Sequence, residues 1–266
     1  RPKEDAEAAA TRAAVRDNRE PRLVEDHSAA NLGLRRNFER AIDRLIGEHG
    51  QGLVLEDDTL PEPSLFPFVA ELLARYADDD RVGAICGQAM SRPAGSTASY
   101  GFSHIPPPWG WATWARAWRT YRRDLRGWPE LRTSGQLERL VGPAAAREWG
   151  ALFDHAATLE SYWIRWVLTG WCEHRLAAVP HTNLVSNIGI DHRSTHTTRS
   201  SRYARHGVQP TAPITFPLTH PPGLETRNAD EEQRDVEAAL PFSPGRRRLK
   251  QLILEGPRAT ARALRR

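Results

Sequence analysis

The chain has 266 residues, of which 39% are hydrophobic and 26% charged, so it can bury a core in one α/β domain and is not a disordered protein. Its formal net charge of +4 and its pI of about 9.4 favour anionic partners such as nucleotides or lipid phosphates, without requiring nucleic acid. Two cysteines, Cys86 and Cys172, are too few for a disulfide framework and indicate a reducing cytoplasm.

The first half of the chain alternates between strand and helix patterns. The pattern predicts helices over residues 4–16, 34–45 and 64–75. It predicts a short strand over 22–25 and buried strands over 52–55 and 82–86. A β-α-β-α-β order is typical of a parallel sheet with helices on both faces. Because the chain begins at Arg1 and has a single methionine, Met90, we expect it to be part of a longer protein.

The strand predicted over residues 52–55 ends in three consecutive carboxylates, Glu56, Asp57 and Asp58. Ligands of open α/β sheets gather at the carboxyl ends of strands, and carboxylate oxygens are the ligands that Mg²⁺ and Mn²⁺ prefer. The pattern therefore indicates a metal and phosphate site. The alternative is a solvated acidic turn ahead of the helix over 64–75, since acids favour helix starts.

After Gly87 the chain becomes loop-like and then enters a stretch with four tryptophans, Trp109, Trp111, Trp114 and Trp118. These rings can form a large aromatic core. They can equally form a wall on which a sugar or base stacks, and Gly110 between two indoles favours that second interpretation because glycine lets the backbone approach a ligand closely.

Further along, the pattern predicts helices over residues 135–140, 144–157 and 159–168, and a strand over 175–179. It also predicts a basic amphipathic terminal helix over 246–254. Glu160 lies on an aromatic-rich helix, where desolvation would raise its pKa and suit it to act as a general base. The alternative is a surface acid close to Arg165. The Gly-containing loop over 187–197 carries Asn187 and His196 and can hold a phosphate or a metal, although its histidines can also be ordinary surface residues.

Taken in order, these motifs resemble the GT-A glycosyltransferases, and within them the bacterial family-2-like sugar transferases related to the N-acetylglucosaminyltransferase I group. The resemblance covers residues 1–197 and leaves 198–266 as a Pro/Arg-rich extension. It depends on five ordered segments, which are Asn31-Leu32-Gly33-Leu34, Leu53 to Asp58, Trp109 to Trp114, Glu160 to Trp166, and Asn187 to Thr197.

The resemblance implies a Rossmann-like mixed sheet flanked by helices, and it implies roles for particular residues. Asp58 would bind Mn²⁺ or Mg²⁺ on the donor diphosphate, Glu56 and Asp57 would contact the donor sugar and ribose, and Glu160 would be the base. The loop with His196 as a second metal ligand would fold over the nucleotide. The remaining expected donor contacts are Asn31, Trp109, Gly110, Trp111, Asn187, Ser194 and Thr195. The first strands of such a domain would precede residue 4, so we expect them to be missing from this chain.

The resemblance implies metal-assisted transfer of a sugar from a nucleotide-diphosphate donor to the hydroxyl of a glycan or lipid-linked acceptor, with inversion, in bacterial surface glycan synthesis. Two alternatives stay open, namely a nucleotidyltransferase or metal phosphohydrolase, and a non-catalytic Arg-rich anion-binding module. The basic segment over 246–254 can lie on an anionic membrane or be a solvated helix. We expect a cytoplasmic protein, peripheral to the inner face of the membrane.

Overall fold

The computed structural model describes residues 9, 10, 13, 24–28, 30–89, 96–189 and 209–224. The chain divides into two compact units, Arg1–Gly33 and Leu34–Arg266. In the first unit Ala9, Ala10 and Ala13 are helical, as the Ala-rich pattern predicts. Val24 and Glu25 are not in a strand, so the described half of the strand predicted over 22–25 is absent.

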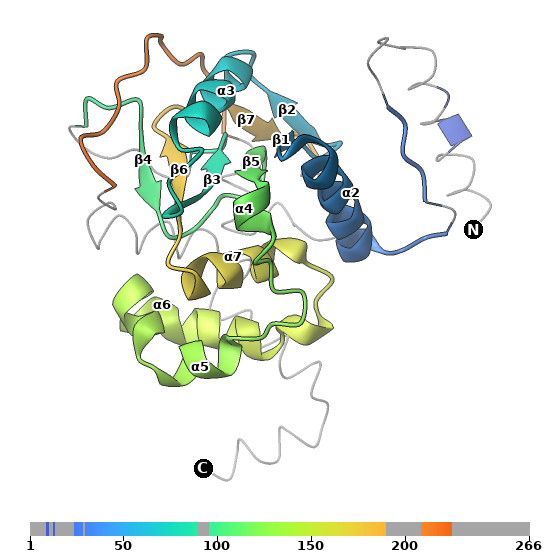
Figure 1. The fold of residues 1–266 in the computed structure, drawn as a ribbon, viewed down its shortest axis with the longest axis vertical. Coiled ribbons are helices and arrows are strands. Elements are labelled where there is room, and N and C mark those ends of the chain that lie inside the picture. The colour runs from blue at the N-terminus through green and yellow to red at the C-terminus, as the bar shows by residue number, and fades with distance from the viewer. Residues whose placement is uncertain are drawn as a thin grey trace. The chain divides into compact units, whose positions relative to one another are not determined.

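The second unit is built on a five-stranded sheet with the strand order β1-β5-β3-β6-β4. These strands are β1 (Gln51–Val54), β5 (Trp111–Trp114), β3 (Val82–Cys86), β6 (Leu176–Pro180) and β4 (Tyr100–Ser103). Only β3 and β6 pair in parallel, whereas β5 pairs antiparallel with both of its neighbours and β4 antiparallel with β6. Helices flank this mixed sheet, with α3 (Leu65–Arg75) on one side and α7 (Tyr162–Cys172) on the other (Figure 1).

The mixed sheet that the resemblance implies is confirmed, whereas the parallel sheet suggested by the β-α-β-α-β order alone is not, because β5 inserts between β1 and β3 in the opposite direction. Trp111 packs in the core on one face of the sheet, while Ala112 and Trp114 pack in the core on the other. This alternation is the two-residue period of a strand, which in the sequence is obscured by the unusual density of tryptophan.

A second, two-stranded sheet joins β2 (Thr59–Pro61) to β7 (Val185–Asn187) in antiparallel pairing. Thr59 lies opposite Asn187, and the Ile188 N–H donates to the Asp58 carbonyl over 2.8 Å. The segment after the acidic triplet is thus fixed to residues more than a hundred positions later in the chain. Such short, non-local strands carry too few residues for periodicity to predict them.

Several helices match those that the sequence pattern predicts, although α7 begins at Tyr162 and not at residue 159, and the helices α4 (Ala115–Trp118) and α5 (Trp128–Thr133) were not predicted. The helix predicted over 34–45 is α2 (Leu34–His49), which buries Ile42 and Ile46 and ends at Gly50, whose φ of +74° suits glycine. The break predicted between two helices before residue 144 is a kink at Gly142 and Pro143 inside α6 (Gln136–Asp154). A 3₁₀ turn (Ala156–Thr158) follows α6.

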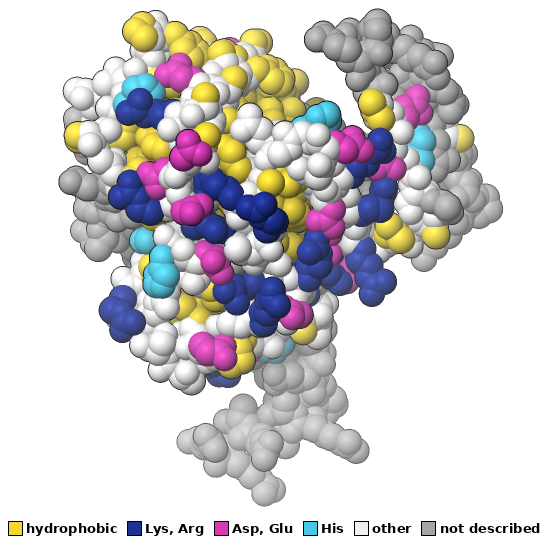
Figure 2. All heavy atoms as spheres, in the orientation of Figure 1, with side chains coloured by type: hydrophobic (Ala, Val, Ile, Leu, Met, Phe, Trp, Pro, Cys, Tyr) yellow, Lys and Arg dark blue, Asp and Glu magenta, His cyan; other side chains and the backbone are white. Residues whose placement is uncertain are grey.

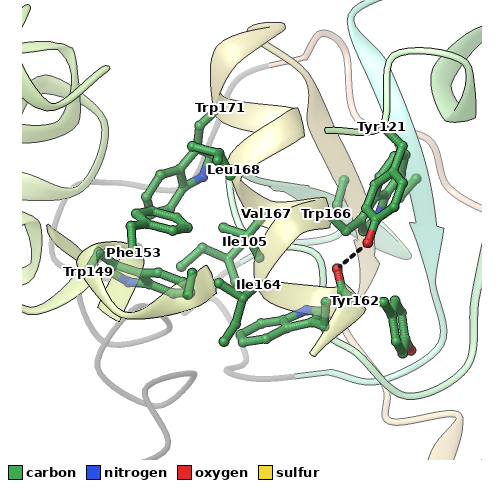
Figure 3. Packing of buried hydrophobic residues seen from close by; sticks show 14 of the residues in the cluster. Ile105, Tyr121, Trp149, Phe153, Tyr162, Ile164, Trp166, Val167, Leu168 and Trp171 are labelled. Carbon is green, nitrogen blue, oxygen red and sulfur yellow. Dashed lines mark hydrogen bonds between the residues drawn. The ribbon is translucent and has the colours of Figure 1, made fainter. Parts of the chain in front are cut away.

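Two hydrophobic cores lie on the two faces of the sheet. The larger one is aromatic and gathers side chains from α5, α6, α7 and the β5–α4 segment, as Figure 3 shows for Trp149, Trp166 and Trp171. Most of its described indoles donate to named acceptors, for example Trp171 to the His104 carbonyl over 2.7 Å. This packing fixes the start of α7 relative to the sheet.

Residues 209–224 pack on the other core, although the sequence analysis placed them in the extension. Ile214 and Leu218 are buried there, and the Ile214 N–H donates to the Ser64 hydroxyl over 3.0 Å. The basic segment over 246–254 lies outside the described residues. Across the part of the chain that the structure describes, every helix is too short or too polar to span a bilayer.

The face drawn in Figure 2 separates hydrophobic from charged surface. Hydrophobic side chains gather over α3 at the top of the view. Within α3, Phe66 is an exposed large hydrophobic residue. Below, arginine and acidic side chains are interspersed, so this face does not present a surface of a single charge.

Candidate functional site

The candidate site lies at one edge of the large sheet, where three strands come together. Val54, the last residue of β1, pairs with Trp111 at the start of β5. Trp111 also pairs with Cys86, the last residue of β3. The carboxyl ends of β1 and β3 therefore meet at the same edge, and the acidic triplet follows β1 after Leu55, at the place where ligands of α/β sheets bind.

A tight turn shapes the acidic triplet. Both the backbone N–H and the hydroxyl of Thr59 donate to the Glu56 carbonyl, over 3.1 and 2.6 Å. This turn half-buries the side chains of Glu56 and Asp58 and leaves Asp57 exposed. Two of the three carboxylates thus lie against the protein, and one faces solvent.

Asp58 has a buried oxygen that is not paired. Its Oδ1 accepts no hydrogen bond from any residue that the structure describes. Burial raises the pKa of Asp58, and the Asn187 side-chain amide acts against that increase. Burying a carboxylate oxygen without a partner costs free energy of folding. A bound cation would offset this cost by pairing with the oxygen.

Gly189 explains how the neighbouring segment can pack so tightly on Asp58. A Cβ atom at this position would overlap Asp58 Oδ2. The Gly189 N–H donates to the Asn187 side-chain oxygen over 2.8 Å, which holds the turn after β7 against the carboxylate. The role of Asn187 in the structure is therefore to support Asp58.

Glu56 is the most perturbed carboxyl group of the site. Burial raises its pKa to about 7, and repulsion from Asp58 and Asp57 adds to this effect, while a hydrogen bond from Tyr162 opposes it. The Tyr162 hydroxyl donates to Glu56 Oε1 over 3.1 Å. The sequence analysis missed Tyr162, because it stands 106 residues away from Glu56 and no local spacing connects the two.

The triplet has no protein counter-ion within the described ranges. No Lys, Arg or His forms an ion pair with Glu56, Asp57 or Asp58 there. In the same ranges no group of three or more His, Cys, Asp and Glu side chains is arranged to hold a metal. A cation here would therefore need ligands from a bound phosphate or water as well as from Asp58.

Glu160 does not have the buried environment that the base hypothesis assumed. It precedes Ser161, the N-cap of α7, and its side chain is 57% exposed. The Nε of Arg35 lies 4.0 Å from Glu160 Oε1. The desolvated carboxyl group is Glu56 instead.

The tryptophans next to the triplet are core residues in this structure. Trp109 and Trp111 are buried, and the Trp111 ring stacks on Tyr162 and Trp166. Gly110 has a φ of +64°, and a Cβ there would collide with Val185. A close approach between two parts of the chain thus accounts for this glycine.

The remaining predicted site residues belong to the first compact unit or lie outside the described residues. Asn31 belongs to the first compact unit, where its side chain accepts the Gly33 N–H over 2.8 Å. Ser194, Thr195 and His196 lie outside the described residues. The structure thus brings Glu56, Asp58, Asn187 and the missed Tyr162 to one sheet edge.

Comparison of the sequence with protein-family models and with curated proteins found no match.

Proposed function

We propose that the chain is a metal-dependent glycosyltransferase of the GT-A type, which transfers a sugar from a nucleotide-diphosphate donor to an acceptor hydroxyl. The observation that carries the proposal is the buried, unpaired Oδ1 of Asp58 in an acidic turn that has no counter-ion among the described residues. The mixed α/β sheet is compatible with this fold, and the motif order in the sequence supports the same class.

The donor set fits a hard divalent cation. Asp58 would hold Mn²⁺ or Mg²⁺, and His196 is the proposed second protein ligand. Such an ion usually takes one or two carboxylates and completes its shell with substrate phosphates and water, in keeping with the few protein ligands found here. When bound, it would neutralise the charge that develops on the diphosphate leaving group.

The chain's own residues would orient the donor and accept the proton. By the resemblance, Glu56 and Asp57 contact the donor sugar and ribose, and Glu160 removes the proton of the acceptor hydroxyl. Glu160 lies just before α7, two residues ahead of Tyr162, whose hydroxyl donates to Glu56. The acceptor class remains a glycan or a lipid-linked glycan, and the proposed location is the cytoplasmic face of the membrane.

Donor hydrolysis by the full chain tests the proposal. The protein is incubated with UDP-glucose, UDP-N-acetylglucosamine and GDP-mannose, each with Mn²⁺ and with a chelator. We expect Mn²⁺-dependent release of a nucleoside diphosphate from at least one donor, and its loss in Asp58→Asn. Release of a nucleoside monophosphate would favour the phosphohydrolase class instead. An Asp58→Asn variant as active as the parent would contradict the proposal.

A further inference from the structure

The ring and hydroxyl of Tyr162 are held from several sides. Its ring stacks on Phe38 with centroids 4.6 Å apart, and also on Trp111. Its backbone carbonyl accepts the Tyr121 hydroxyl over 3.2 Å, the bond drawn as a dashed line in Figure 3. The side chain is buried, so the phenol has little freedom to turn away from the acidic triplet.

The hydroxyl of Tyr162 connects the aromatic core to Glu56. The Trp111 indole N–H lies 3.4 Å from the Tyr162 oxygen, and the Tyr162 hydroxyl donates onward to Glu56 Oε1 over 3.1 Å. The donated bond fixes one carboxylate oxygen of Glu56. No described residue donates to the other oxygen, Oε2, which is therefore available to accept a hydrogen bond from a ligand.

We propose that Tyr162 is a positioning residue that holds Glu56 so that its Oε2 accepts a hydroxyl of the donor sugar. The proposal rests on the proposed function, which places the sugar of a nucleotide donor beside Glu56. A carboxylate held in one rotamer binds a hydroxyl more tightly than a mobile one, because less conformational entropy is lost on binding. Tyr162 then contributes to the recognition of the sugar and not to that of the nucleotide.

Calorimetric titration separates these two parts of the ligand. The full chain is titrated, in the presence of Mn²⁺, with UDP-glucose, UDP-N-acetylglucosamine and GDP-mannose, and with UDP and GDP as references without a sugar. Tyr162→Phe removes the hydroxyl and keeps the ring that stacks on Phe38. Tyr76→Phe is the matched control, since it removes a buried hydroxyl that bonds to Tyr100 in the other core.

In Tyr162→Phe we expect the Kd of the bound nucleotide sugar to rise about tenfold, as for the loss of one hydrogen bond to a charged group, with the Kd of the matching nucleotide changed less than about twofold. Glu56→Gln should show the same selective loss, and the double variant should lose no more than either single variant. Tyr76→Phe should leave both values unchanged.

Four results would overturn the inference. Equal weakening of nucleotide sugar and nucleotide in Tyr162→Phe would show a general structural role. Unchanged affinity for both, or a parent chain that binds nucleotides but none of the sugars, would show that this pair does not recognise the sugar. A parent chain that binds no nucleotide at all would overturn the proposed function, and this inference with it.

Discussion

The aromatic core and the acidic edge differ in how their buried polar groups are hydrogen-bonded. In the core, Trp163 and Trp171 donate to backbone carbonyls, each over 2.7 Å. Two indoles, Trp149 and Trp166, have no hydrogen-bond partner among the described residues, and each is a neutral donor among aromatic rings. At the edge the unpaired atom belongs to a carboxylate, Asp58.

The difference matters because the costs of the two kinds of unpaired group are unequal. An unpaired neutral donor costs about 1–3 kcal/mol, whereas an unpaired ionised group costs more and changes its pKa. We therefore expect the aromatic core to stabilise the fold, and the unpaired carboxylate at the acidic edge to destabilise it. Strain and unpaired charge of this kind cluster at binding sites.

Truncating the core tests the first half of this comparison and has the largest expected effect. Trp171 is fully buried and packs on Trp149 and Phe153. Trp171→Ala should lower the free energy of unfolding by about 3–5 kcal/mol, measured by urea denaturation followed by far-UV circular dichroism. Trp171→Phe should cost less, because it keeps most of the ring volume. A loss below about 1 kcal/mol in the alanine variant would mean that this core contributes little.

The pH dependence of stability tests the edge. The pKa of Glu56 rises from 4.5 to about 7 on folding. Below pH 4.5 both states are protonated, and between these values the folded chain keeps a proton that the unfolded chain has lost. Stability should therefore fall as the pH rises from about 4.5 to 7, by up to about 3 kcal/mol.

Urea denaturation at pH 5 and pH 8, in a buffer without divalent metal, measures this effect as a difference between the parent chain and Glu56→Gln. In Glu56→Gln, the free energy of unfolding should fall less between pH 5 and pH 8 than in the parent chain. Glu138→Gln, at an exposed position of α6, provides the control and should keep the parental slope. Identical slopes in the parent and Glu56→Gln would contradict the assignment.

Gly189→Ala sharpens the comparison at the contact with Asp58. The added methyl group would overlap Asp58 Oδ2, so the carboxylate or the turn must move. We expect a loss of about 1–3 kcal/mol in the free energy of unfolding, together with weaker Mn²⁺ binding measured by calorimetry. If Mn²⁺ affinity is retained in a folded variant, the tight packing around Asp58 is not part of the site.

Gly47→Ala has the smallest expected effect and is the matched glycine control. Gly47 lies within α2, and a Cβ there would meet no atom within 4 Å. Alanine should therefore stabilise the chain by about 0.5–1 kcal/mol through helix propensity and a less flexible unfolded state. Thermal unfolding would measure it, and a lower Tm would show that this part of α2 is packed differently.

The sequence predicts the elements that have a clear apolar periodicity. It does not predict the elements that form only through contacts between residues far apart in the sequence. The helices α2 and α3 and the strands β1, β3 and β6 follow apolar patterns long enough to interpret. The strands β2 and β7 have three residues each and exist only through their mutual pairing. The antiparallel direction of β5 could not be predicted for the same reason, because it depends on pairing with strands that are distant in the sequence.

The candidate site shows the same limit. The acidic triplet is visible in the sequence because its residues are consecutive, and the prediction that it lies at a strand end is confirmed. Tyr162 could not be found from spacing, because a tyrosine after a helix N-cap is usual in a buried helix and the contact with Glu56 is purely tertiary. Glu160 is predicted as the base because an aromatic-rich helix would desolvate it, but burial depends on the folded chain, and there the Glu160 side chain is exposed.

If the unpaired oxygen of Asp58 binds a cation together with a nucleotide diphosphate, nucleotide binding must depend on both the metal and this carboxylate. Calorimetric titration of UDP and GDP into the full chain, with Mn²⁺ or with a chelator, measures this dependence. We expect nucleotide binding that requires Mn²⁺ in the parent chain, and its loss in an Asp58→Asn variant whose free energy of unfolding, without metal, is not lowered. Binding with equal affinity in the parent and in Asp58→Asn, or no Mn²⁺-dependent binding by the parent, would contradict it.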